Sequence, residues 1–518
     1  MKKKLFKTRL LSFAAFCGLT FASCANEDVA QNSNNTDNDK NLTTFTAGDP
    51  STRTSMESDG KFFWEAGDKI WVKDDNGIWN ASSNSPTGKT AYFKFKVPGT
   101  YTAHMSYKVY YPGQSGSQDQ VTISANQSQA EPNTTTHLGT SGDCGMATAT
   151  RITGERNFNF TLDHKAAYLL LLPRTSNTIL HDCYLTKIEV NSDNDITSTY
   201  TLDPVTGKLA GTGTGKQIIL ITGGNWGSTY QDGFPLTNNA TSAATNGSYV
   251  VIKPGTHKLK IRYWVKDIVT NVEGTITKTL PSTTYDQNKY YNITANLDVK
   301  NYDGDHYYMW DAQEQYWKGF EWTQNLPAGI GQPTTNFSSS SKYPKNSSDA
   351  NHRWYNDGGG YGRFDATRSS FNNVPNVNEM TWYAAKGDPR WDGDELWTTM
   401  GHLYKGGMWF KKKAKISGYD TYTAVDGTDW RKNGHVNNWS VSQTLPSAAD
   451  AGNYFYLPAL GYYGNGYLYL LGIMGNYWSS NAFPSSEIYA YGLRFDSGIV
   501  YVNTNFREYG FRVEPSFE

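Results

Sequence analysis

Short runs of alternating side chains, each closed by turn residues, recur along most of this chain and constrain its fold more than any other feature. The clearest run is 488–495, in which large apolar residues alternate with smaller or polar ones. Such alternation is typical of a strand with two different faces. A turn signal at 496–498 and further runs at 499–504 and 509–513 follow it. The sequence therefore predicts a small antiparallel meander at the C-terminal end.

The composition favours the same class of fold. The 518 residues include 14% aromatic side chains and 49 glycines, whereas the helix formers Ala, Leu and Glu do not dominate. A chain of this kind is expected to be mainly β, with many turns. Its net charge of −1 gives no general attraction to nucleic acid or to an anionic membrane. We therefore expect no nucleic-acid partner.

The runs upstream of the meander fall into two groups, at 43–156 and 157–301. Short strands separated by Gly, Pro and Asn predict a β-sandwich for each group. The run 168–172 is continuously apolar, as expected of a central buried strand. The length of the chain leaves room for a third domain at 302–518.

The third domain is expected to contain two helices. A helix is predicted over 376–386, because Gly387 follows it as a suitable C-cap. A shorter helix is predicted over 446–452. Asp388, Asp392, Asp394 and Glu395 also occur here, and we interpret them as a solvated acidic loop in preference to a calcium site.

The N-terminus carries a targeting segment. Residues 1–23 have a basic start and an apolar core that is too short to span a bilayer. The tetrapeptide 21–24 resembles a lipobox, which implies cleavage before Cys24 and lipidation of its thiol. The alternative is an ordinary secretory signal followed by a chance cysteine. Residues 24–42 are polar and read as a flexible tether. The acidic pair at 27–28 resembles the surface-export signal of Bacteroidetes lipoproteins, which implies an exposed position on the outer membrane.

The sequence offers little support for chemistry or cofactors. Cys144 and Cys183 could form one disulfide in an oxidising compartment or remain as buried free thiols. The histidines show no metal-binding spacing, and no nucleophile elbow or phosphate-binding loop is present. The tripeptide 131–133 matches the sugar-binding motif of animal lectins, but it lies outside the third domain and is read as coincidence. We expect no catalytic residue, no metal and no cofactor, and hence a protein that is not an enzyme.

The C-terminal third of the chain resembles bacterial C-type-lectin-like domains. The motifs are GNYWSS at 475–480, FDSG at 495–498 and YGFRVEP at 509–515, with further likeness at 375–397, 401–413 and 457–463. The likeness extends to the Fibrobacter-type major paralogous domains and to the variable proteins of diversity-generating retroelements. It implies an α+β domain over 302–518 that presents exchangeable residues on a fixed scaffold. It argues against formylglycine-generating oxidases of the same fold, because no cysteine occurs after Cys183.

The resemblance implies two sets of residues in this domain. The scaffold would consist of Gly475, Trp478, Gly498, Gly510 and Phe511. The ligand-contacting and exchangeable residues would be drawn from Tyr467, Tyr469, Asn481, Phe483, Tyr489, Tyr491, Tyr501, Asn503, Asn505, Phe506 and Tyr509. Tyr gives large contact area at a low entropic cost, and Asn gives adaptable hydrogen bonds, so these residue types suit a binding surface. The alternative is that the aromatic residues belong to strands and cores.

Residues 43–300 resemble the fimbrillin family of Bacteroidales. The motifs are TRTS at 52–55, FFWEAGDKIWV at 62–72, YKVYYPG at 107–113, FNFTLDHKAAYLLLLPRT at 158–175 and NKYYNITANLDV at 288–299. This resemblance implies two transthyretin-like β-sandwiches. In that family, removal of the first strand by cleavage at an arginine opens a groove for a donor strand. Arg53 is the nearest candidate here.

These expectations together describe a lipid-anchored protein of the outer-membrane surface. Two fimbrillin-like sandwiches would carry a lectin-like head that binds a protein or glycan on host or neighbouring cells. The alternative is a structural, tip or accessory subunit of a fimbria (pilus), which would have other fimbrial subunits as partners. A surface glycan-processing enzyme is a third possibility, without positive support in the sequence.

Overall fold

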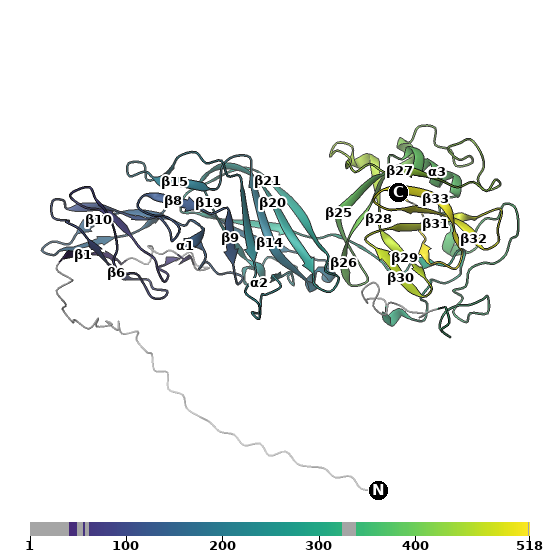
Figure 1. Cartoon of the computed structure of the whole chain (residues 1–518), viewed down its shortest axis with the longest axis horizontal. Coiled ribbons are helices and arrows are strands. Elements are labelled where there is room, and N and C mark those ends of the chain that lie inside the picture. Colours follow the sequence, from purple (N-terminus) through teal and green to yellow (C-terminus); the bar gives the residue numbers. More distant parts are fainter. Residues whose placement is uncertain (1–40, 49–54, 57–61, 324–337, 516) are drawn as a thin grey trace, which may run out of the picture. The chain divides into compact units, whose positions relative to one another are not determined.

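The computed structural model describes residues 41–48, 55–56, 62–323, 338–515 and 517–518, and Figure 1 shows their secondary structure. Over these residues the protein is mainly β, which confirms the fold class expected from the sequence. The segment expected to be a signal peptide, Cys24 and Arg53 all lie outside the described residues. In the part of the chain that the structure describes, no helix is both long and apolar enough to cross a bilayer.

The first sheet packs around an aromatic core. Its eight strands include β12 (Asp163–His164), which pairs with β10, and the others follow the order β5 (Trp79–Ala81), β4 (Trp71–Lys73), β7 (Ser106–Tyr111), β10 (Gly145–Arg151), β11 (Asn157–Phe160), β1 (Leu42–Ala47) and β6 (Phe93–Pro98). Strands β2 (Ser55–Met56) and β3 (Phe62–Phe63) form a separate pair. Phe45 of β1 is fully buried and stacks on Phe158 of β11, with ring centroids 5.0 Å apart. Strand β1 is thus an integral part of this core.

A second core lies between three further sheets. The largest has the order β21 (Glu273–Tyr285), β20 (Gly255–Asp267), β14 (Cys183–Ser192), β17 (Gln217–Thr222) and β9 (Asn126–Gln129), with β18 (Phe234–Pro235) paired to β14. The smaller two have the orders β19 (Ser248–Ile252), β13 (Ala167–Arg174), β22 (Tyr290–Asn296) and β16 (Leu209–Ala210), β15 (Ser198–Leu202), β8 (Gln120–Ile123). Short helices are α1 (Leu138–Ser141), α2 (Ala243–Asn246) and η2 (Thr178–Asp182). Residues 168–172 of β13 are all buried, as the apolar run predicts.

The two groups of strands interleave across the boundary expected at 156/157. Strands β8 and β9 precede that boundary, yet they pair with β15 and β17 in the second group. Strand β11 follows the boundary, yet it pairs with β1 and β10 in the first sheet. The reason is that apolar side chains of β8 belong to the second core, whereas Phe158 belongs to the first. A single cut in the sequence therefore does not separate the two cores.

The C-terminal region contains two more sheets. A four-stranded sheet has the order β23 (Lys300–Tyr302), β25 (Arg390–Thr399), β26 (His402–Lys411) and β28 (Tyr454–Pro458). An eight-stranded sheet has the order β24 (Tyr307–Tyr308), β34 (Phe511–Arg512), β31 (Gly475–Ala482), β32 (Tyr489–Phe495), β33 (Ile499–Phe506) and β27 (Asn437–Ser440), with the hairpin of β29 (Leu460–Gly464) and β30 (Tyr467–Leu471) attached to β31. Short 3-10 helices are η3 (Glu321–Thr323), η4 (Ser369–Phe371), η5 (Lys413–Lys415) and η6 (Ala451–Asn453).

The C-terminal meander forms with one difference from its predicted order. Strands β31, β32 and β33 are antiparallel neighbours, but β34 does not continue them. It lies between β24 and β31 and runs parallel to β31. This position lets Phe511 stack on Trp478 at 4.3 Å. The gain from burying these two large rings explains why the last strand returns to the middle of the sheet.

One of the two predicted helices is present. Helix α3 (Val377–Lys386) begins after Asn376, which forms a capping box with Glu379, and ends at Gly387. Its buried face includes Val377 and Met380, which pack on the core of the meander. At 446–452 the structure has only turns and the start of η6, so the second helix is absent from this described segment.

Candidate ligand-binding surface

A tyrosine-rich hairpin forms one half of the candidate surface. Tyr462 of β29 lies opposite Tyr469 of β30, and the next outward pair places Tyr467 opposite Gly464. The intervening pair, Tyr463 and Leu468, is buried. Since successive residues of a strand point to opposite faces, the three outer tyrosines share one face of the hairpin.

The far end of the meander forms the other half. Tyr489 and Phe506 are the terminal pair of the β32–β33 ladder, and their ring centroids are 4.8 Å apart. After β33 the chain turns, and Tyr509 donates its backbone N–H to the carbonyl oxygen of Phe506 at 3.0 Å. This turn brings the Tyr509 ring within 5.6 Å of Phe506 and 5.6 Å of Tyr462. The turn thus joins the meander to the hairpin.

Six rings consequently form one continuous chain of contacts, which we call the aromatic strip. The successive centroid distances are 6.4, 5.8, 5.6, 5.6 and 4.8 Å. All fall in the range at which aromatic rings attract one another. Tyr469 is 42% exposed, Phe506 is 39% exposed, and the others are half-buried. The members of the strip, in order of contact, are Tyr467, Tyr469, Tyr462, Tyr509, Phe506 and Tyr489.

The strip rests on a rigid layer of buried rings. Phe511 lies beneath Tyr462 and Tyr509, and Trp478 stacks under Phe511. The indole N–H of Trp478 donates to the carbonyl oxygen of Tyr308 at 2.7 Å, which fixes its orientation. A side chain at Gly510 would come within 2.6 Å of the Tyr316 ring. This close approach accounts for the glycine beside the strip.

The other two proposed scaffold glycines lie elsewhere. Gly475 packs directly on the Phe495 ring, where a larger residue would collide with it. Gly498 is exposed in the turn after β32, and its N–H donates to Asp496 at 2.8 Å. No close neighbour requires a glycine at 498.

Charged groups border the strip. Arg494 is held by the amide oxygens of Asn476 and Asn505, at 3.1 and 3.2 Å. The Glu508 side chain is half-buried and makes no hydrogen bond or ion pair with any described residue. Burial raises the pKa of its carboxyl group. Burial and then the neighbouring Tyr462 and Glu508 raise the pKa of Tyr509.

Five of the eleven predicted contact residues lie in the strip, and three lie in the interior. Tyr491 is fully buried and donates its hydroxyl to the carbonyl oxygen of Trp430 at 3.2 Å. Asn505 is buried beside Arg494, and Asn481 is buried near the start of helix α3. In this structure these three side chains have structural partners and present no surface to a ligand.

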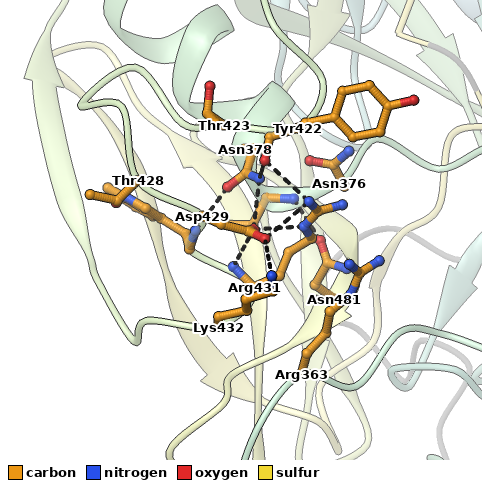
Figure 2. Close-up of polar contacts among 12 residues, drawn as sticks. Arg363, Asn376, Asn378, Tyr422, Thr423, Thr428, Asp429, Arg431, Lys432 and Asn481 are labelled. Atoms are coloured by element: carbon orange, nitrogen blue, oxygen red, sulfur yellow. Dashed lines mark hydrogen bonds and ion pairs between the residues drawn. The ribbon is translucent and has the colours of Figure 1, made fainter.

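Asn481 lies near a polar network centred on Asp429 (Figure 2). The Asn481 side chain accepts a hydrogen bond from the N–H of Val377 at 2.8 Å and donates to Asp365 at 2.7 Å. Asp429 pairs with Arg431 at 2.7 Å and accepts from Asn378 at 2.9 Å. Burial alone would raise the pKa of Asp429, but the hydrogen bonds from Arg431 and Asn378 lower it to about 2. The network holds the loop before β27 against helix α3.

The remaining predicted residues are half-buried but outside the strip. Phe483 packs edge to face on Tyr491 at 5.4 Å. Tyr501 lies opposite Arg494, and Asn503 lies opposite Gly492 in the β32–β33 ladder. Sequence reasoning omitted Tyr462, the ring that links the hairpin to Tyr509. Its neighbour Tyr463 is buried, and two adjacent tyrosines give no local signal of which one faces outward.

Other candidate sites do not assemble. Among the described residues, no group of three or more His, Cys, Asp or Glu side chains could hold a metal ion. In the acidic loop, Asp388 pairs with Arg390, whereas Asp392 accepts from the Trp409 indole. Cys144 and Cys183 are buried free thiols, so the disulfide is not formed.

Comparisons with known proteins give only weak likenesses. No protein-family model and no curated protein matches the chain. A candidate cell adhesion protein from Bacteroides ovatus ATCC 8483 is similar in structure, with 14% identity and a TM-score of 0.30, over 49% of this chain and 92% of that chain. The fimbrial anchor protein Mfa2 from Porphyromonas gingivalis is also similar, with 11% identity and a TM-score of 0.22, over 46% of this chain and 82% of that chain. These TM-scores are low, and the function is therefore argued from the geometry of this chain.

Proposed function

We propose that this protein is a cell-surface adhesin whose C-terminal region binds a protein or glycan ligand through the aromatic strip. The observation that carries this proposal is the unbroken contact chain of six outward rings, contributed by four strands and a turn. Rigid aromatic side chains offer large contact area with little entropy to lose, and they dominate many binding hot spots. The buried layer of Phe511 and Trp478 keeps the strip in one arrangement.

The proposal includes a lectin-like head and a lipid anchor. The combination of one central helix, α3, with a meander and long connecting loops supports a C-type-lectin-like head. The lipobox-like tetrapeptide supports an anchor at Cys24 on the outer-membrane surface. The β-rich region before the head would then serve as its stalk.

Loss of the most exposed rings tests the binding role. Wild-type protein and a Tyr469→Ala/Phe506→Ala double variant would be screened against an immobilised panel of defined glycans and purified extracellular-matrix proteins. The double variant should lose binding by about tenfold or more, because truncation of a hot-spot residue costs roughly 2 kcal/mol or more. Tyr422→Ala is the matched control, since Tyr422 is 73% exposed but lies outside the strip. Equal binding by all three proteins would reject the strip as the contact surface.

Diversification of the head is a separate proposal. Deep sequencing of the codons for 462–509 in one grown population would show clustered changes at adenine positions if the head is diversified. We expect such changes at strip positions and constancy at Asn481, Tyr491 and Asn505, which are buried. A uniform sequence without a neighbouring reverse transcriptase gene would indicate a fixed adhesin.

A fimbrial subunit is the second candidate function. Strand β1 precedes Arg53 and lies between β11 and β6, so cleavage at Arg53 would remove an inner strand and leave a groove. The C-terminal residues 511–518 are not free to act as a donor strand for another subunit, because Phe517 is buried and Glu518 accepts a hydrogen bond from the Tyr383 hydroxyl at 2.9 Å. This candidate predicts a cleaved N-terminus near Arg53 and ladders of polymer on gels of unheated samples. A single intact band would count against it.

A further inference from the structure

The C-terminal region also contains a small polar hollow. Its volume is 110 Å³, and its walls come from residues 311, 313, 347, 352, 354–357 and 368. At roughly 10–15 Å³ for each water-sized position, it has room for about the atoms of one sugar ring with its hydroxyl groups. It is too small for a larger ligand to enter completely.

Five polar side chains line this hollow, and all five are exposed to solvent. None of them makes a side-chain hydrogen bond or an ion pair with any residue in the described ranges. Together they offer an imidazole, an amide, a hydroxyl, a carboxylate and a guanidinium group, and so both donors and acceptors. These side chains are Gln313, Ser347, His352, Asp357 and Arg368.

Two aromatic rings complete the wall. The rings of Trp354 and Tyr355 lie 4.3 Å apart, at an angle of 33°. The indole N–H of Trp354 is buried and makes no hydrogen bond with any described residue. A buried donor without a partner is unfavourable, and a bound polar group or water is the usual way to satisfy it.

The frame of the hollow is held by Asp311. Its carboxylate accepts from the N–H groups of Thr367 and Arg368, at 2.9 and 2.7 Å, and from the Asn356 amide at 2.7 Å. Asp311 and His352 both adopt positive φ, at 54°, which is uncommon for residues other than glycine. An unfavourable backbone conformation of this kind persists where the surrounding contacts fix it, and such conformations are enriched at functional sites.

The charges of the walls point to a neutral ligand. The wall carries one carboxylate, that of Asp357, and one guanidinium, that of Arg368, and neither has an ion-pair partner among the described residues. The Asp311 carboxylate already accepts hydrogen bonds from two backbone N–H groups. A balanced pair of this kind favours hydroxyl groups, which donate to the carboxylate and accept from the guanidinium. A flat aromatic wall suits the apolar face of a sugar ring.

We propose that this hollow is a subsite for one neutral sugar unit. The inference deepens the proposed function, on which it rests, because it names the class of ligand.

Saturation-transfer NMR on the full chain tests this subsite. The probes are methyl glycosides of neutral hexoses, with a hexuronic acid and choline as charged comparisons. We expect neutral glycosides to bind and to lose about tenfold in affinity in Asp357→Asn and in Arg368→Gln, the effect of losing one hydrogen bond to a charged group. Asp394→Asn is the matched control, because that carboxylate is 91% exposed and lies outside the hollow.

The outcomes separate this inference from the proposed function. The subsite is overturned if no neutral glycoside shows a saturation-transfer signal at a concentration about tenfold above a millimolar Kd. Unchanged binding in both hollow variants, or a preference for choline, overturns it as well. If the hollow variants lose sugar binding while Tyr469→Ala/Phe506→Ala retains full ligand binding, the subsite stands and the strip proposal fails. If instead Tyr469→Ala/Phe506→Ala loses ligand binding while the hollow variants keep sugar binding, the strip proposal stands and the subsite fails.

Discussion

Among single residues, Arg512 shows how the last strand is fixed in the sheet. Its guanidinium is buried and pairs with Asp303 at 3.1 Å and with Glu514 at 2.7 Å. It also lies 5.3 Å from the centre of the Tyr307 ring. Since Arg512 adjoins Phe511, this ion-pair cluster holds the ring that supports the aromatic strip.

Removal of this buried cation should destabilise the C-terminal region. Arg512→Met would lower the free energy of unfolding by about 3 kcal/mol, because Glu514 would lose its cationic partner and Asp303 would keep only His306. Arg363→Met is the matched control; its ion pair with Asp365 is largely exposed and should contribute less than about 1 kcal/mol. Urea unfolding followed by tryptophan fluorescence would measure both. Equal losses in the two variants would contradict the structural role of Arg512.

Asp429 should make the C-terminal region sensitive to acid. Its folded pKa of about 2 lies below the ordinary 3.8, so the ionised form stabilises the fold. That contribution is complete above about pH 4 and is lost as the pH falls towards 2, and it amounts to roughly 1–2 kcal/mol. In calorimetry, Asp429→Asn should lower Tm at pH 6, and the difference from wild type should narrow below pH 3. Asp394→Asn, at an exposed position, should follow the wild type throughout.

Residue types predicted the position of the aromatic strip in part. The surplus of Tyr in the last sixty or so residues indicated the region in which the strip lies, and Tyr is the residue type that a binding surface would use. Alternation could not separate Tyr489 from Tyr491, although only the first lies in the strip. The difference arises at the end of the β32–β33 ladder, where Tyr489 meets Phe506 and leaves the core. Such an end effect depends on packing partners far away in the sequence.

Among the elements, those fixed by local contacts were the easier to predict. Helix α3 carries its own start and stop signals, since Asn376 and Glu379 form a capping box and Gly387 closes the helix. Strand β34 has no such local signal. Its parallel pairing with β31 depends on Phe511 meeting Trp478, more than thirty residues away. Long-range pairing of this kind leaves little trace in a single sequence.

Strand β1 should be essential to the first sheet. Phe45→Ala would remove a fully buried ring that stacks on Phe158 and meets Tyr101 edge to face, at an expected cost of about 3–5 kcal/mol. Thr46→Ala is the control on the same strand, because Thr46 is only half-buried and does not belong to the aromatic core. Thermal unfolding would compare the two. A similar small effect from both changes would show that β1 contributes little to the core.

For the whole molecule, the interleaved strands decide which parts can exist alone. Strand β9 pairs with β17, and β8 pairs with β15, although each comes before the boundary suggested by the spacing of the runs. Spacing in a sequence measures the distance between runs along the chain but not their partners in space. The number of strand groups was therefore predictable, whereas the exchange of strands between them was not.

A fragment of 157–301 should fail to fold. It lacks β8, β9 and helix α1, so β15 and β17 each lose one neighbouring strand and the second core loses Val121, Ile123 and Leu138. Unpaired strand edges and an open core favour aggregation over folding. A fragment of 41–301 retains both groups of strands and should unfold in a cooperative transition. Calorimetry and the dispersion of amide signals in NMR would compare them. Cooperative unfolding of 157–301 alone would show that the exchanged strands are dispensable, and that the two sheets fold independently.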